Sequence, residues 1–296
     1  MAHDFLKGLG VALVTPFRQD KSIDYEALER IVERTINGGC DYLVALGTTA
    51  ETPTLSLEEK EKITRFIVEK AQGRIPLIVG IGGNNTKAVA DDIRNRDLSG
   101  YSAILSVTPY YNKPTQEGLY RHFMYIAETS PLPIILYNVP GRTGVNMTAN
   151  TTLRLSAACS NIIGIKEASG NHIQCEEIMK GCRDDFHLIS GNDPDTVSLM
   201  KKGASGVISV LANVLPDKMK IIVDNCLKSN YSEAERMNYF LNPLMGQLFE
   251  EGNPAGIKAM LSAWGLIENI LRLPLVAVNP HLENKIKSTL ATIKII

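Results

Sequence analysis

Short and almost unbroken apolar runs recur along this chain at similar intervals. Eight of them stand out, at residues 10–15, 42–46, 77–81, 103–107, 134–137, 162–165, 186–189 and 206–210. Runs of this length without polar alternation are typical of parallel strands that are buried on both faces. The segments between them carry helix signals, such as the N-cap candidate Asp24 and the capping box that begins at Ser56.

This alternation of strand and helix signals continues to about residue 230 and predicts an α/β fold, a (β/α)₈ TIM barrel. An open doubly wound sheet is the main alternative, but no glycine fingerprint follows the first strand. Residues 233–249, 255–268 and 281–293 look helical, and no strong strand signal returns among them. We therefore predict a barrel of residues 1–230 and a C-terminal all-helical domain of residues 231–296.

Composition narrows the function. A formal net charge of −1 argues against a nucleic-acid partner. No apolar run approaches the length of a membrane-spanning helix, and the apolar stretch at 9–17 lacks the cleavage pattern of a secretory signal. The five cysteines are scattered and the five histidines form no pair with ligand spacing. We expect a cytoplasmic protein with reduced thiols, no membrane partner and no metal.

The residue that carries most information is Lys166, at the end of the sixth apolar run. Burial disfavours the charged form of an amine, and a neutral amine attacks ketones to form a Schiff base. Tyr137 ends the preceding run in the same way. Strict alternation places Ile162, Gly164 and Lys166 on one face, with Gly164 leaving space beneath the amine. The alternative is a lysine that reaches into water beside a tyrosine that only packs.

Polar residues follow the other runs too, and reactive groups of barrels collect at the carboxyl ends of strands. Thr48 and Thr49 follow the second run and could hold a carboxylate, although such a turn is common. Arg142 lies in a glycine-rich turn after the fifth run. It could clamp a carboxylate through two hydrogen bonds, or it could be an ordinary surface arginine.

Further candidates follow the remaining strands. Tyr110 and Tyr111 stand between prolines after the fourth run, where a packing loop at a subunit contact is the alternative. Gly191 offers a close backbone approach after the seventh run. Ile208 lies in the eighth run and would cap the pocket.

Together, the segments 47–51, 108–112, 137–144 and 164–168 resemble the dihydrodipicolinate synthase family of pyruvate-dependent, Schiff-base aldolases. The resemblance extends from about residue 10 to residue 258. It implies an enzyme that condenses pyruvate with aspartate 4-semialdehyde in the diaminopimelate route to lysine. It also implies a homotetramer, built as a dimer of dimers, and no cofactor beyond the lysine imine.

The resemblance assigns the catalytic roles. Lys166 would form the imine with pyruvate, and Tyr137 would donate and accept protons. Thr48 would connect Tyr137 with Tyr111, which would come from the neighbouring subunit. Hydroxyl groups suit this reaction, because each step moves a proton.

It assigns the binding roles as well. Thr49 would hold the pyruvate carboxylate, and Arg142 would receive the carboxylate of aspartate semialdehyde. Backbone at Gly191 and Ile208 would complete the pyruvate site. Arg142 resembles the synthases in particular, since sialic acid lyases and sugar-acid aldolases usually differ at this position.

The family's feedback site is only partly present. Members that are inhibited by lysine bind it at a dimer interface, and Asn84 and Tyr110 fit their pattern. Leu57, Lys60 and Ala88 stand where those members often carry histidines and a glutamate. A cation at Lys60 without an acidic partner repels an amine, so we predict weak or absent inhibition by lysine.

Two alternatives to this function stay open from the sequence. One is another pyruvate Schiff-base lyase, such as N-acetylneuraminate lyase or a keto-sugar-acid aldolase, which would share the lysine, the tyrosine and the threonines. The other is a non-catalytic barrel that senses a keto acid. Only an enzyme that uses imine chemistry should gain a covalent adduct when it is reduced with borohydride in pyruvate.

Overall fold

The computed structural model describes residues 3–294 of the chain. In this part of the chain the parallel strands form a closed barrel in sequence order, with the last strand paired to the first. The barrel strands are β1 (Gly8–Ala12), β2 (Tyr42–Ala45), β3 (Leu77–Gly80), β4 (Ala103–Val107), β5 (Ile134–Asn138), β6 (Ile162–Glu167), β7 (His187–Ser190) and β8 (Gly206–Ser209). The predicted (β/α)₈ barrel is thereby confirmed.

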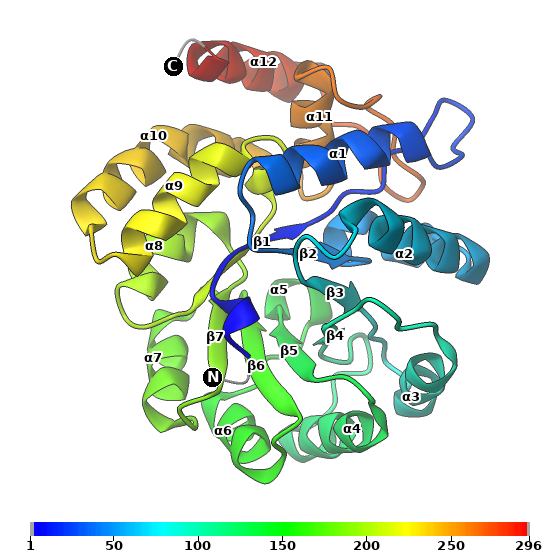
Figure 1. Cartoon of the computed structure of the whole chain (residues 1–296), viewed down its shortest axis with the longest axis vertical. Coiled ribbons are helices and arrows are strands. Elements are labelled where there is room, and N and C mark those ends of the chain that lie inside the picture. The colour runs from blue at the N-terminus through cyan, green and yellow to red at the C-terminus, as the bar shows by residue number, and fades with distance from the viewer. Residues whose placement is uncertain (1–2, 295–296) are drawn as a thin grey trace.

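Helices surround the strands, as Figure 1 shows. At the start of α1, the Asp24 side chain accepts a hydrogen bond from the backbone amide of Ala27. At the start of α2, Ser56 and Glu59 form the predicted capping box. The helices of the barrel are α1 (Tyr25–Asn37), α2 (Leu57–Ala71), α3 (Thr86–Asn95), α4 (Gln116–Thr129), α5 (Pro140–Thr143), α6 (Ala149–Ala158), α7 (His172–Gly181), α8 (Thr196–Met200) and α9 (Pro216–Leu227).

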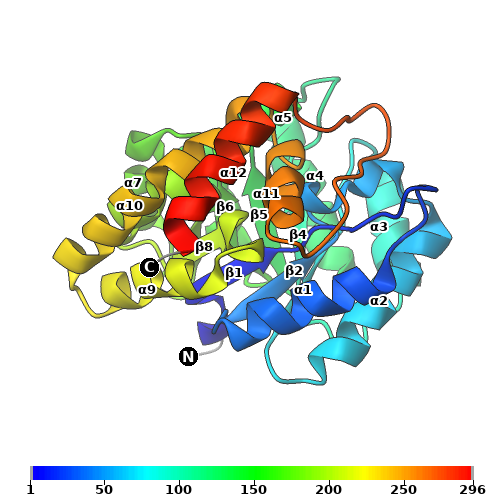
Figure 2. The same ribbon diagram turned by 90° about the horizontal axis from the view of Figure 1, so that it is seen from above.

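The C-terminal region is helical, as the sequence predicts. It contains α10 (Tyr231–Glu250), α11 (Ala255–Ala263) and α12 (Pro280–Lys294), and no strand lies between residues 231 and 294. Helix α10 packs on α9, and Figure 2 shows α10, α11 and α12 grouped on one side of the barrel. Whether this region is a separate domain from residue 231 onward stays a prediction.

Two apolar layers cover the two faces of the barrel wall. The outer layer lies between strands and helices and includes Leu43, Val79, Ile104, Leu136, Ile165 and Val207. The inner layer fills the barrel with side chains from successive strands, namely Val44, Ile78, Leu105, Ile135, Ile163, Ile189 and Ile208. Interdigitating branched side chains make such an interior a packed core and leave the chemistry to its mouth.

Strand β6 breaks the strict alternation that the sequence suggested. Ile134 pairs with Ile162, but Ile135 pairs with Gly164, so β6 carries one extra residue at this point. As a result Ile162 packs in the outer layer and Ile163 in the inner one. The expectation that Ile162 shares a face with Lys166 is therefore wrong.

The role expected of Gly164 is also wrong in its detail. A Cβ at this position would lie 2.6 Å from the carbonyl oxygen of His187 on β7. Glycine is required here because the backbones of β6 and β7 approach closely beside the extra residue, and not to leave space beneath the amine.

Glycines also lie where β1 pairs with β8 to close the barrel, and replacing one of them tests how closely the two backbones must approach. Gly8 pairs with Gly206, and a Cβ at Gly206 would lie 1.9 Å from the carbonyl oxygen of Gly8. We predict that Gly206→Ala lowers the free energy of unfolding by about 1–3 kcal/mol, because backbone on both sides must shift. Denaturant unfolding of the purified variants measures this.

Gly246→Ala is the matched control. Gly246 lies inside α10, and a Cβ there would meet no atom within 4 Å among the described residues. Its replacement should raise stability by up to about 1 kcal/mol, because alanine favours a helix over glycine. Equal stabilities of the two variants would contradict the seam argument.

Candidate active site

The side chains of Lys166 and Tyr137 come from neighbouring strands at the mouth of the barrel. The two residues pair in register between β5 and β6, and the Lys166 Nζ lies 4.6 Å from the centroid of the Tyr137 ring. Lys166 is only 5% exposed and Tyr137 only 8%. The alternative in which the lysine reaches into water is thus wrong, and the amine is held against the phenol.

A buried carboxyl group, Asp193, completes this cluster, and the sequence analysis did not single it out. Its Oδ2 accepts hydrogen bonds from the amides of Val210 and Leu211 at 3.0 and 3.1 Å. Its Oδ1 has no hydrogen-bond partner among the described residues. Burial raises the pKa of Asp193, whereas its hydrogen bonds and the positive charge of Lys166 oppose that rise. Its position just beyond the carboxyl end of β7 was the available signal.

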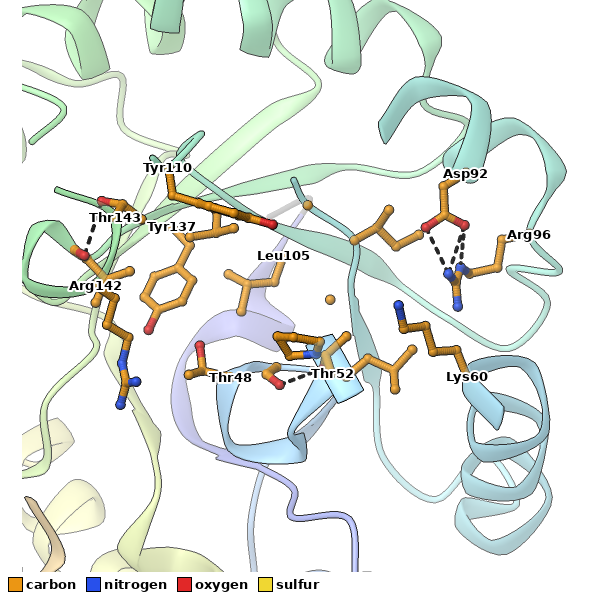
Figure 3. Close-up of a pocket in the computed structure, with 18 residues that line it drawn as sticks. Thr48, Thr52, Lys60, Asp92, Arg96, Leu105, Tyr110, Tyr137, Arg142 and Thr143 are labelled. Carbon is orange, nitrogen blue, oxygen red and sulfur yellow. Dashed lines mark hydrogen bonds and ion pairs between the residues drawn. The ribbon is translucent and has the colours of Figure 1, made fainter. Parts of the chain in front are cut away.

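The turn after β2 presents the two predicted threonines differently. Figure 3 shows the hydroxyls of Thr48 and Tyr137 pointing into the same part of the pocket. Thr49 is 2% exposed, and its Oγ1 accepts a hydrogen bond from Asn253 Nδ2 at 3.0 Å. The carbonyl of Asn253 in turn accepts a hydrogen bond from Arg142 Nη2 at 2.9 Å. One residue of the C-terminal region therefore joins two predicted substrate-binding side chains.

A buried ion pair fixes the same turn from behind. Glu51 follows the turn in the left-handed conformation, and its carboxylate pairs with the ammonium of Lys258 on α11, both side chains being fully buried. Lys258 also donates to the Ile270 carbonyl at 2.9 Å and lies over the ring of Phe17. Burial lowers the pKa of Lys258 to about 8, with Glu51 opposing the shift. No local pattern in the sequence indicates this pair, because its partners lie on distant segments.

A pocket of about 310 Å³ opens beside this cluster. Of the predicted site residues, those that line it are Thr48, Tyr110, Tyr137 and Arg142, whereas Lys166, Thr49, Gly191 and Ile208 lie outside its lining. Tyr110 forms one wall of the pocket, as Figure 3 shows.

The other predicted residues occupy varied positions. The Gly191 amide donates to the Glu167 carbonyl at 2.7 Å, so only its carbonyl is left for a ligand. Ile208 is fully buried in the inner layer. Tyr111 is 88% exposed and does not line the pocket of this single chain. Its contribution from a neighbouring subunit stays a prediction.

Of the two residues that fit the feedback pattern, Asn84 donates a hydrogen bond from Nδ2 to the carbonyl of Tyr110 at 3.3 Å.

Within residues 3–294, no group of three or more histidine, cysteine, aspartate or glutamate side chains is placed to hold a metal ion. In the same range, none of the helices has the length and apolar character needed to cross a membrane.

A buried lysine against a tyrosine at the mouth of a closed parallel barrel defines a class of enzymes, the barrel lyases that react through a lysine imine. Residues 5–293 match the model of the dihydrodipicolinate synthetase family, and the chain belongs to that family. The family predicted from the sequence is thus confirmed.

Three relatives show how close this membership is. A protein of Phocaeicola vulgatus named 4-hydroxy-tetrahydrodipicolinate synthase is 50% identical over 295 residues, covering 100% of this chain and 99% of its own. The structure of dihydrodipicolinate synthase from Thermotoga maritima superposes with a TM-score of 0.95 at 41% identity, covering 98% of this chain and 99% of that one. The chloride-inhibited synthase of Acinetobacter baumannii, solved with pyruvate, has a TM-score of 0.95 at 40% identity and covers 98% and 100%.

The buried ion pair generates a stability prediction. Lys258→Met leaves the Glu51 carboxylate buried without its cation, so the free energy of unfolding should fall by about 3–5 kcal/mol. In the double variant Lys258→Met/Glu51→Gln the buried negative charge is absent. In the wild type, the backbone N–H of Arg272 donates a hydrogen bond to the Glu51 carboxylate at 3.0 Å, and the side-chain oxygen of Gln at position 51 can still accept it. The double variant should therefore recover a large part of the loss in a denaturant titration. Strictly additive losses would show that the pair does not interact.

Proposed function

We propose that this chain condenses pyruvate with aspartate 4-semialdehyde to give 4-hydroxy-tetrahydrodipicolinate, as a synthase of the diaminopimelate route to lysine. The observation that carries this proposal is the buried amine of Lys166 against Tyr137, in a family member half identical to proteins of that name. Another pyruvate lyase or a keto-acid sensor would have to share this family and this cluster.

The first step is imine formation. The neutral amine of Lys166 attacks the keto carbon of pyruvate, water leaves, and a protonated imine joins the substrate to the enzyme. The positive imine nitrogen makes the neighbouring methyl group acidic, because it takes up the electrons that the departing proton leaves behind. The ionised carboxylate of Asp193, which has one oxygen without a hydrogen-bond partner among the described residues and is influenced by the positive charge of Lys166, would stabilise this cation.

Proton transfer would fall to the phenol of Tyr137. It lies over the amine and lines the pocket, so it can reach both the leaving water and the substrate methyl. Thr48 lies beside it and would pass the proton onward to Tyr111 of a second copy. A relay of this kind needs a neighbouring subunit, which a dimer would supply. The homotetramer, a dimer of dimers, is proposed from membership of the family.

Carboxylate recognition would divide between two positions. Thr49 is held by Asn253 through its oxygen, which leaves its hydroxyl hydrogen free to donate to the pyruvate carboxylate. Arg142 uses one nitrogen on the Asn253 carbonyl and keeps the other for the carboxylate of the semialdehyde. The carbonyl of Gly191 and the side chain of Ile208 would complete the pyruvate site.

Carbon–carbon bond formation then follows. The enamine attacks the aldehyde carbon, and the aldehyde oxygen takes up a proton. The amino group of the second substrate next attacks the imine carbon, closes the ring and displaces the amine of Lys166. The lysine supplies the electron sink for each step, so we propose that no metal or cofactor takes part, and that the enzyme acts in the cytoplasm.

Replacing Lys166 tests the mechanism directly. After borohydride reduction in pyruvate, intact mass should show a reduced pyruvyl adduct on the wild type and none on Lys166→Ala. In a coupled assay with both substrates Lys166→Ala should lose nearly all activity. Tyr137→Phe should lose most of it, about 10²–10⁴-fold. Near-normal turnover of the lysine variant would refute the imine scheme.

The same assay tests whether free lysine inhibits the enzyme. Lys60 and Tyr110 both line the pocket, and Ala88 supplies no acid to offset the cation at Lys60. The carboxylate of Asp92, which also lines the pocket, is already paired with Arg96. We predict that free lysine at millimolar concentration leaves the rate nearly unchanged. Half-inhibition by submillimolar lysine would contradict this prediction.

A further inference from the structure

Two buried polar residues lie directly after the proposed catalytic residues and take no part in the mechanism above. Asn138 follows Tyr137 at the end of β5, and Glu167 follows Lys166 at the end of β6. The two residues pair in register, as Tyr137 and Lys166 do one position earlier. Because successive side chains of a strand point to opposite faces, Asn138 and Glu167 lie on the outer face of the barrel wall, behind the reaction centre.

The Glu167 side chain is only 2% exposed and accepts hydrogen bonds on both of its oxygens. Asn138 Nδ2 donates to these oxygens at 3.2 and 3.0 Å, and the Ser169 amide donates to Oε1 at 2.8 Å. Gln174 Nε2 on α7 donates to Oε2 at 2.9 Å. Each of these partners is a donor, so the surroundings of Glu167 are built for a carboxylate.

The Asn138 side chain is fully buried, and its orientation is fixed by the segment that precedes α6. The Met147 amide donates to Asn138 Oδ1 at 3.0 Å, which turns Nδ2 toward Glu167. Asn138 Nδ2 also donates to Asn146 Oδ1 at 2.8 Å, and Asn146 Nδ2 donates to Gln174 Oε1 at 2.9 Å. Asn138, Asn146, Glu167 and Gln174, called the polar brace below, therefore join β5 and β6 to α7, which lies outside the strands in Figure 1.

The polar brace lies next to the irregular part of β6, where the strand carries one extra residue opposite β5. Without that residue, alternation would turn Glu167 into the barrel and Lys166 toward the helices. The buried donors of Asn138 and Gln174 would then lose their acceptor, which costs free energy. The polar brace thus favours the pairing that presents the amine of Lys166 to the phenol.

We propose that Asn138 and Glu167 are positioning residues, which hold the Lys166 amine and the Tyr137 phenol in the geometry that proton transfer needs. The proposal rests on the proposed function, because it assigns a role within that same site. A fully hydrogen-bonded buried network is rigid, and it fixes the two strand ends at the position of the reacting groups. Both side chains point away from the barrel interior, so they act through their neighbours in the chain and not on the substrate.

Exchange of the pyruvate methyl protons in D₂O, followed by proton NMR, tests the proposal without the second substrate. The Lys166 imine loses a methyl proton to form the enamine, and the enamine takes up a deuteron, both through Tyr137. In Glu167→Gln a side-chain NH₂ group replaces one accepting oxygen and meets the donors of Asn138 and Gln174. We expect the maximal exchange rate per folded molecule to fall about 10–100-fold, because misplaced reacting groups transfer protons slowly.

A double variant tests whether the loss arises from this pair. Asn138→Asp/Glu167→Gln exchanges the amide and the carboxylate between the two strands and keeps donor opposite acceptor. The Met147 amide can still donate to position 138, and the amides of Asn146 and Gln174 can each turn over. The double variant should recover most of the lost exchange rate. A double variant as slow as Glu167→Gln would overturn the proposal.

Asn161→Ala is the matched control, because Asn161 lies just before β6 at its other end. Its Nδ2 donates to the carbonyls of Ala127, Ser130 and Leu132 at 3.0 to 3.3 Å. Its replacement should lower the free energy of unfolding and leave the exchange rate per folded molecule unchanged. A loss of rate equal to that of Glu167→Gln would show a general effect of stability and overturn the positioning role.

A milder variant keeps the test decisive if circular dichroism shows that Glu167→Gln does not fold. Gln174→Leu removes one donor from Glu167 and leaves its contact with Asn138, and it should slow the exchange about threefold. A rate equal to that of the wild type in either variant would overturn the positioning role alone. A wild type that exchanges no methyl protons and gains no pyruvyl adduct would overturn the proposed function, and the positioning role with it.

Discussion

One extra residue in β6 decides which way the reactive amine points. Ile162 packs in the outer layer, so strict alternation would also turn Lys166 outward, toward the helices. The pairing of Ile135 with Gly164 inserts a residue and reverses the alternation, which brings Lys166 beside Tyr137 at the mouth. The close approach of β7 at Gly164 is part of the same irregularity. The chemistry of the barrel therefore depends on a local departure from ideal strand geometry.

The C-terminal region fixes side chains on the other side of the site. Lys258 pairs with Glu51, and Asn253 contacts both Thr49 and Arg142. A barrel mouth made only of loops would leave these side chains mobile, since loops are the least ordered part of such folds. A buried charge pair resists displacement, because separating it exposes an uncompensated charge to an apolar interior. The helical region thus acts as a clamp on the turn that carries Thr48 and Thr49.

The sequence predicted what depends on local pattern and missed what depends on distant contacts. The eight apolar runs, the cap at Asp24 and the capping box at Ser56 follow from neighbouring residues, and all appear in the structure. Lys166 could be singled out because a lysine at the end of an apolar run is rare. The bulge in β6 could not, because it is defined by the pairing of β6 with β5, a strand distant in the sequence. Asn253 and Thr49 are 204 residues apart, and no local signal joins them.

Three buried or half-buried lysines show that partners, more than burial, decide what an amine can do. Lys258 is fixed by Glu51 and by the Ile270 carbonyl, so its hydrogens are committed and its role is structural. Burial and the guanidinium of Arg96 lower the pKa of Lys60, with Asp92 opposing the shift, so its charged form is disfavoured. Lys166 Nζ lies 4.6 Å from the centroid of the Tyr137 ring, which can attract a cation but forms no hydrogen bond to the lone pair of a neutral amine. Of the three, it is the amine whose surroundings leave its nitrogen free to form a bond.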